Sequence, residues 1–276
     1  MSSMEISIDG QIVKAQFTSI SPQVAHKFLE SMVDNRPVKK RVVDGMVRAM
    51  KAGDFPFCAD AVRFDDSGQL IDGEHRMRAI IESGTTHTML VVYGLDPKSR
   101  MYMDQGVTRR PADQITLGLK RKNASKLAAV ANILIRWEAA AHLTTNLKPT
   151  PNEVYRYVEE NVGLLELAVH HQNELVRGIG YGTAACAAVF VRAYAVDPIF
   201  TVRFFEGLTD GVDLVPTQPL HTLRQALITR PRKEHWQPLD TMYAMVRMFN
   251  AERRDETMAK LQFPASAYEL QHFLIR

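Results

Sequence analysis

The spacing of apolar residues changes near residue 115, and this change constrains the fold more than any other feature of the 276-residue chain. Before that point, short alternating runs, turn signals and short helical patterns follow one another. After it, apolar residues recur at helical spacing in segments separated mostly by Pro or Gly. These segments are 124–141, 151–160, 163–176, 183–195, 198–208, 220–228 and 239–253. The sequence therefore predicts an α+β module over residues 1–115, followed by an all-α module over residues 116–276.

Within the first module, the pattern predicts individual elements. Residues 11–17 alternate as an edge strand would after the Asp9-Gly10 turn. Residues 61–64 and 69–71 read as a hairpin around a tight turn. A helix is expected over 74–83, ended by Gly84, and a buried strand over 89–93.

Composition narrows the class of protein. The chain has 34 Lys and Arg against 31 Asp and Glu, and this small excess permits a phosphate-bearing partner without requiring one. Cys58 and Cys186 lie among apolar neighbours and form no CxxC pair, which favours buried, reduced thiols over a zinc site. The opening residues resemble no secretory signal, and the longest apolar run, 184–191, is far shorter than the roughly 20 residues of a membrane span. We expect a cytoplasmic protein, in the host cytoplasm if a phage encodes it, with no membrane partner.

The segment Asp72-Gly73-Glu74-His75-Arg76 is the main candidate for a functional site. A strand leads into it and a helix begins at once, so unpaired helix N–H groups and a partial positive charge are available to an anion. Gly73 lets the backbone approach a ligand, and His75 and Arg76 add side-chain donors. The pattern predicts a phosphate cradle. Asp72 and Glu74 would repel a phosphate, so we expect them to bind a metal or accept a proton.

A purely structural interpretation of the same residues stays open. Asp72 can be an ordinary helix N-cap, and Glu74 a first-turn acid that complements the helix dipole. His75 and Arg76 are then solvated surface residues.

The run Gly68-x-Leu70-Ile71-Asp72-Gly73-Glu74-His75-Arg76-x-x-Ala79 resembles the signature of the ParB/sulfiredoxin-like superfamily. The flanks Asn35-Arg36 and Met103–Asp113 are similar to a branch common in phages and actinobacterial mobile elements. The resemblance covers the first 115 residues well and the helical remainder loosely. It implies a ParB/sulfiredoxin-like fold for the first module, but one fold hosts many functions.

Relatives in that superfamily include ParB proteins that bind and hydrolyse CTP, nucleases, a free-serine kinase and sulfiredoxin. The resemblance implies that Gly73, Glu74, His75 and Arg76 hold phosphate groups. Glu74 stands where Gln is usual, which brings the motif nearer to the Gly-Glu-x-Arg form of the CTP-binding proteins. The turn lacks the reactive Cys of sulfiredoxin, which argues against sulfinic-acid repair.

Two further groups are candidates for the same ligand. Asp104, Arg109 and Arg110 flank a glycine turn and could close over the pocket, holding a metal and more phosphates; the alternative is a solvated loop before a helix at Pro111. Asn35 and Arg36 are either ligand contacts or an ordinary helix entry.

The helical module carries weaker signals. Lys120-Arg121-Lys122 is the best candidate for tracking a DNA backbone. Glu166, His170 and Glu174 share one helix face, which is typical of a salt-bridged surface more often than of a metal site.

The sequence thus predicts a phage or mobile-element ParB-like protein that binds a nucleotide or DNA phosphate at the turn Asp72–Arg76. In this hypothesis the ligand is a nucleoside triphosphate with Mg²⁺, and Asp72 and Glu74 bind the metal. If the protein also hydrolyses the nucleotide, the same two residues are catalytic. The first alternative is a metal-dependent DNA nuclease. The second is a non-enzymatic module for DNA or a host protein whose cradle is vestigial. Whether the chain forms a homodimer stays open.

Overall fold

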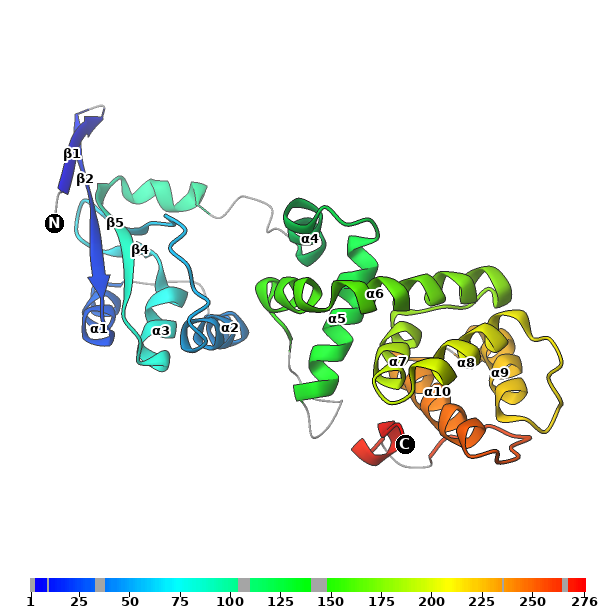
Figure 1. Ribbon diagram of the computed structural model, residues 1–276. Helices are drawn as coiled ribbons and strands as arrows, with labels where there is room; N and C mark the ends of the chain where they lie inside the picture. The colour runs from blue at the N-terminus through cyan, green and yellow to red at the C-terminus, as the bar shows by residue number, and fades with distance from the viewer. Residues whose placement is uncertain are drawn as a thin grey trace. The chain divides into compact units, whose positions relative to one another are not determined.

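The chain forms two compact units, Met1–Val107 and Thr108–Arg276, in a computed structural model that describes residues 3–8, 10–32, 38–103, 110–139, 148–234, 236–264 and 268–276 (Figure 1). Within these residues, all the strands lie in the first unit and the second is helical. The fold class is therefore α+β. Helix α4 (Pro111–Leu119) already belongs to the second unit, so this division comes a few residues before the change in apolar spacing.

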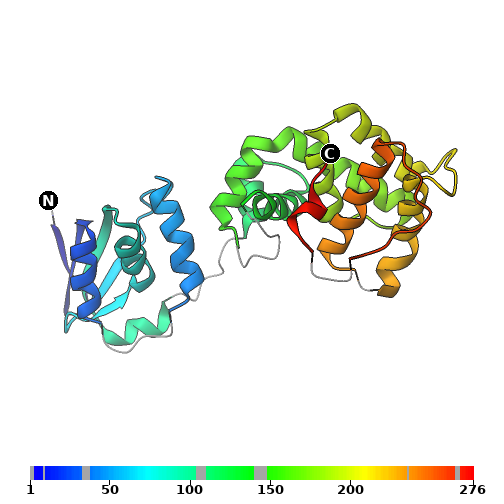
Figure 2. The same cartoon turned by 90° about the horizontal axis from the view of Figure 1, so that it is seen from below.

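The first unit is built on a five-stranded sheet in the order β1-β2-β5-β3-β4. Its strands are β1 (Ser3–Ile8), β2 (Gln11–Ile20), β3 (Val62–Asp65), β4 (Leu70–Asp72) and β5 (His87–Leu95). Strands β3 and β5 run parallel, and the other neighbours are antiparallel. The prediction of an edge strand at 11–17 is wrong, because β2 lies between β5 and β1. Strand β1 takes the outer edge instead (Figure 1, Figure 2).

The helices α1 (Pro22–Glu30), α2 (Lys40–Lys51) and α3 (Glu74–Ser83) complete the first unit, with the short 3-10 helix η1 (Pro97–Tyr102) after β5. Its core contains Met89 and Val91 of β5 with Met77 and Ile80 of α3. Side chains alternate along a strand, so Leu90 lies on the opposite face of the sheet from Met89 and Val91.

Predicted bounds of α3 are confirmed at both ends. The helix begins at Glu74 and ends at Ser83, and Gly84 follows as its C-cap with a φ of 71°, the left-handed conformation that suits a glycine after a helix. The hairpin around residues 65–68 is also confirmed, as β3 and β4.

The second unit packs helices around α7 (Ala184–Tyr194). The others are α5 (Ala124–Ala139), α6 (Pro151–Ile179), α8 (Pro198–Asp210), α9 (Pro219–Glu234) and α10 (Pro238–Arg253), with the short 3-10 helix η2 (Leu270–Phe273). Helix α7 contacts α5, α6, α8 and α10. The long apolar run therefore lies in a helix that is buried against other helices of the unit. Among the described residues, no helix is both long and apolar enough to cross a membrane.

Helix α6 joins two segments that the sequence separates. Asn161 has non-helical angles (φ −120°, ψ 18°), and its side chain donates to the Tyr157 carbonyl at 2.9 Å. The break in apolar spacing near residue 161 is thus a kink inside one helix. At the start of α6, Thr150 and Glu153 form the reciprocal capping pair that pairs two otherwise unsatisfied N–H groups.

Candidate functional site

Gly73 joins β4 directly to α3 and is the N-cap residue of that helix. Its φ of 117° lies where side-chain-bearing residues are strained. A Cβ atom at this position would also lie 3.1 Å from Cγ1 of Val62. The strand can therefore turn into the helix within one residue only because that residue is glycine. We call Asp72–Arg76 the strand–helix turn.

Gly73→Ala is expected to destabilise the first unit by about 2 kcal/mol, through backbone strain and crowding against Val62. Urea unfolding followed by circular dichroism measures this loss. Gly84→Ala is the matched control, because Gly84 also has positive φ but a Cβ there would meet nothing within 4 Å. Equal losses in the two variants would show that contact with Val62 contributes nothing.

Arg76 is the best-anchored side chain of the turn. Only 13% of it is exposed, and its Nη2 donates to the Ala61 carbonyl at 2.7 Å and to Oδ2 of Asp72 at 3.3 Å. Its Nη1 donates to the Asp60 carbonyl. Arg76 therefore ties α3 to the segment that leads into β3, and it is not a solvated surface residue.

The two acidic side chains of the turn each face arginines. Asp72 accepts from Arg63 on β3 and from Arg76. The side chain of Glu74, only 4% exposed, accepts from Nε of Arg78 at 2.9 Å. Asp72 makes no cap, since Gly73 occupies the N-cap position without a side-chain bond to the helix. Three arginines thus surround two carboxylates at the positive end of α3.

This arrangement does not fit a Mg²⁺ site built on Asp72 and Glu74. Mg²⁺ takes carboxylate oxygens in open octahedral geometry, and here arginines compete for the same oxygens. Within the residues that the structure describes, no three His, Cys, Asp or Glu side chains gather to hold a metal ion. We therefore derive no metal-dependent step from these two residues.

His75 connects the turn to α2. The backbone N–H of Lys39, the N-cap residue of α2, donates to Nε2 of His75 at 3.2 Å. Nε2 is therefore an acceptor in this bond, and the proton of a neutral ring sits on Nδ1. The imidazole thus holds the start of α2 beside the start of α3.

Five predicted site residues remain. Asn35, Arg36, Asp104 and Arg109 lie outside the described residues. Arg110 is described as an exposed residue at the N-cap of α4 in the second unit, where its backbone N–H donates to Asp113 at 2.8 Å.

Arg63 and Arg78 are site residues that the sequence analysis missed, and Arg78 alone had a signal. Arg78 follows Glu74 by four residues, the spacing of ion pairs along a helix. Arg63 pairs with Asp72 across the β3–β4 hairpin. A regular hairpin around residues 65–68 would place Asp72 opposite Ala61, so the register shift between Arg63 and Phe64 is what brings Arg63 to Asp72.

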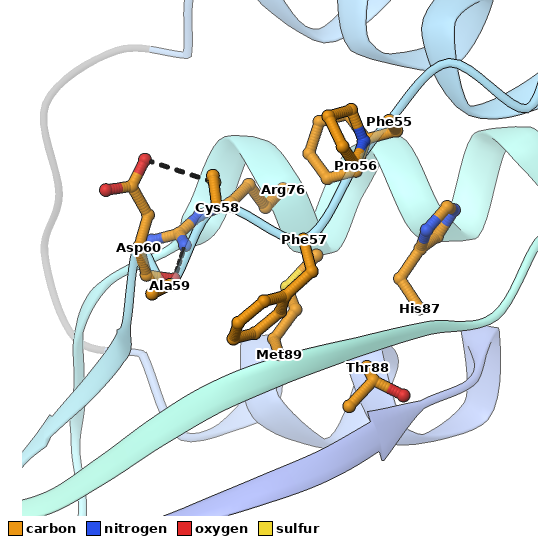
Figure 3. A pocket seen from close by; sticks show the side chains of 10 residues that line it. All are labelled: Phe55, Pro56, Phe57, Cys58, Ala59, Asp60, Arg76, His87, Thr88 and Met89. Atoms are coloured by element: carbon orange, nitrogen blue, oxygen red, sulfur yellow. Dashed lines mark hydrogen bonds between the residues drawn. The ribbon is translucent and has the colours of Figure 1, made fainter.

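A small pocket lies beside Arg76, as Figure 3 shows. The segment Phe55–Asp60 and residues 87–89 of β5 line it. The prediction of a buried thiol is wrong for Cys58, which is exposed and lies 3.5 Å from the carboxylate of Asp60, and it is confirmed for Cys186. The pocket is partly open, and a volume of about 20 Å³ in it can take the centres of water molecules, which is room for about one water molecule. A ligand at the turn would therefore bind on the surface rather than inside this cavity.

The polar face of α6 carries ion pairs, as the spacing of Glu166, His170 and Glu174 predicts. Arg121 lies 3.6 Å from Glu166, and Glu174 pairs with His170 at 4.0 Å and with Arg177. Glu166 and Glu174 thus already have basic partners.

His171, next along α6, is buried, and its ring stacks on Phe190 at 4.6 Å. Burial lowers the pKa of His171 below its ordinary 6.5, and the nearby His170 adds to this effect, while Glu206 and Glu174 oppose it. In the unfolded chain the ring takes up a proton more readily, so stability falls as the pH drops through about 6.5.

We expect the free energy of unfolding of the second unit to decrease between about pH 7.5 and 5, and to decrease less in His171→Phe. Tryptophan fluorescence in urea measures it, because both tryptophans, Trp137 and Trp236, lie in this unit. His170→Gln, at the exposed neighbour, should keep most of the slope. An unchanged slope in His171→Phe would contradict the assignment.

No family model, curated protein or solved structure matches this chain. The proposal below therefore depends on the geometry of the strand–helix turn and on the resemblance of its motif.

Proposed function

We propose that this protein is a ParB/sulfiredoxin-like protein of the phage or mobile-element branch that binds phosphate groups of DNA or of a nucleotide at the strand–helix turn. The observation that carries the proposal is the set of arginines at the start of α3. Arg63, Arg76 and Arg78 outnumber the carboxylates they contact.

The chemistry of the turn suits an anion at its surface. The N-terminal end of α3 carries partial positive charge, and guanidinium groups bind phosphate oxygens in pairs. Arg63 and Arg78 are partly exposed, so they can reach a ligand while Arg76 keeps the turn in place. Asp72 and Glu74 hold these arginines in position in the absence of ligand.

Binding without hydrolysis is the form of this function that the ion pairs favour. A carboxylate that activates water or holds a metal needs free oxygens, whereas Asp72 and Glu74 each accept from arginine. The nuclease and nucleotide-hydrolase alternatives both require those contacts to break.

The test is fluorescence anisotropy with labelled duplex DNA, and competition by each nucleoside triphosphate, at about 50 and 200 mM salt. Arg63→Ala is expected to weaken binding about tenfold and to reduce its salt dependence. Arg41→Ala, at an exposed arginine on α2, is the matched control and should change little. Equal affinity in wild type and Arg63→Ala would contradict the proposal, as would the absence of any binding.

A second variant separates binding from catalysis. Asp72→Asn removes a negative charge and frees Arg63, so a binding site should hold phosphate more tightly. If Asp72 instead holds a metal or activates water, the same variant should lose DNA cleavage or triphosphate hydrolysis measured with Mg²⁺. Cleavage by the wild type that is lost in Asp72→Asn would replace our proposal with the nuclease alternative.

A further inference from the structure

The edge strand β1 leaves apolar side chains and one backbone edge uncovered. All six of its residues are exposed, including Met4 at 62%, Ile6 at 48% and Ile8 at 52%. Strand β2 pairs with one edge of β1, and no strand of the described residues pairs with the other. An exposed, apolar edge strand is a template for pairing with another chain.

The apolar surface continues from β1 across the sheet. Met4 and Ile6 lie opposite Ala15 and Val13 of β2, and further along β2 Phe17 lies opposite Leu90. These residues share the face that points away from the core. The ring of Phe57 packs against Phe17 at 5.6 Å, and both remain about half exposed. A continuous exposed apolar surface of this kind marks an interaction site.

We propose that a second copy of this chain covers the open edge, with the two β1 strands pairing antiparallel about a two-fold axis that passes beside Ile6. The two five-stranded sheets then join into one continuous sheet. The axis is perpendicular to the sheet, so the two apolar faces lie on the same side, and every contact at the interface occurs twice.

The hairpin restricts the register of this pairing. Ile8 pairs with Gln11, so two residues connect β1 to β2. In a two-residue hairpin the residues flanking the loop form a hydrogen-bonded pair, and the ladder alternates from there. The backbone N–H and C=O groups of Ser3, Glu5 and Ser7 therefore point to the open edge. Antiparallel pairing of two identical edges must bring such outward-pointing residues opposite one another.

Charge excludes one of the remaining registers, and the length of overlap favours an axis at Ile6, which pairs residues 4–8, over an axis at Met4, which pairs only residues 3–5. An axis at Glu5 would place two glutamates directly opposite each other, which is destabilising. An axis at Ile6 places Glu5 opposite Ser7 of the second copy. It also places Ile6 opposite Ile6, and Met4 opposite Ile8, on the shared apolar face. This register pairs the outward backbone groups of Glu5 and Ser7 and continues the apolar strip without pairing like charges.

The first test is the mass of the full chain in solution, by sedimentation equilibrium up to about 100 µM. We expect twice the monomer mass of 31.2 kDa. Ile6→Lys should restore the monomer, because two lysines would face each other across the axis. Ile199→Lys is the matched control, at an isoleucine that is 70% exposed on α8, and it should stay dimeric.

The second test reads the register by cross-linking in a Cys58→Ser background, which removes the exposed native thiol. Residues at the axis form a non-hydrogen-bonded pair with Cα atoms about 4.5 Å apart, within disulfide range. Ile6→Cys should therefore give a covalent dimer on oxidation. Met4→Cys should not cross-link alone, but it should do so when mixed with Ile8→Cys.

Three results would overturn the proposal. A monomeric wild type would show that no second copy covers the open edge of β1, and a strand of another protein would then be the candidate partner. A dimer that persists in Ile6→Lys would place the interface elsewhere. Cross-linking of Met4→Cys with itself, in preference to Ile6→Cys, would show another register. None of these results depends on whether the strand–helix turn binds phosphate.

Discussion

Arg76→Ala is expected to lower the free energy of unfolding of the first unit by about 3 kcal/mol. The variant removes a largely buried guanidinium that donates to two backbone carbonyls, of Asp60 and Ala61, and to the Asp72 carboxylate. Both carbonyls lose a charge-assisted hydrogen bond, and Asp72 keeps only Arg63. The segment before β3 then loses its attachment to α3.

The measurement must isolate the first unit. Both tryptophans lie in the second unit, so the loss should appear in hydrogen exchange of β3 and α3 but not in the tryptophan-monitored transition. Arg63→Ala is the control: it removes a more exposed arginine from the same carboxylate and should cost about 1 kcal/mol or less. An equally small loss in Arg76→Ala would show that its three contacts contribute little. Because Arg76 has this structural role, phosphate binding is better tested at Arg63.

Phe190→Ala is expected to destabilise the second unit by about 3–5 kcal/mol. Phe190 is fully buried on α7, with its ring 4.6 Å from His171 and 4.9 Å from Phe205. Truncation leaves a cavity where α6, α7 and α8 meet. Packing around a rigid helix that contacts several others can close this cavity only in part.

Tryptophan fluorescence in urea reports the effect of Phe190→Ala directly, since both tryptophans belong to the unit. Ile199→Ala, on the exposed surface of α8, should change stability by less than about 0.5 kcal/mol. Hydrogen exchange in β3 and α3 should stay as in the wild type. A loss below about 1 kcal/mol in Phe190→Ala would contradict the close packing of the three helices.

Much of the local structure followed from the sequence, because its signals lie within a few residues of one another. The glycine after the apolar pattern of α3 marks where that helix ends, and the turn residues at 65–68 mark the β3–β4 hairpin. Helical spacing after residue 115 correctly indicated an all-helical second part. The change from strand to helix at Gly73 was readable for the same reason.

The contacts of the candidate site were only partly readable. The sequence placed Asp72, Glu74, His75 and Arg76 on one turn and spaced Arg78 four residues after Glu74. It gave no sign that Arg63 lies beside Asp72. That outcome depends on the pairing of β3 with β4 and on which rotamers the core leaves open to Arg76 and Arg78.

The sequence by itself determined the bounds of α3, the place of the β3–β4 hairpin and which residues share the strand–helix turn, because hydrogen-bond patterns and turn conformations are local properties of the chain. Only the tertiary structure decided that β2 is an inner strand and that β1 forms an open apolar edge. It also decided that Arg76 donates hydrogen bonds to backbone carbonyls of a segment distant in the sequence. These features join residues far apart in the chain. Alternating side chains look alike in an inner strand and in an edge strand, so strand order depends on which distant surfaces pack together.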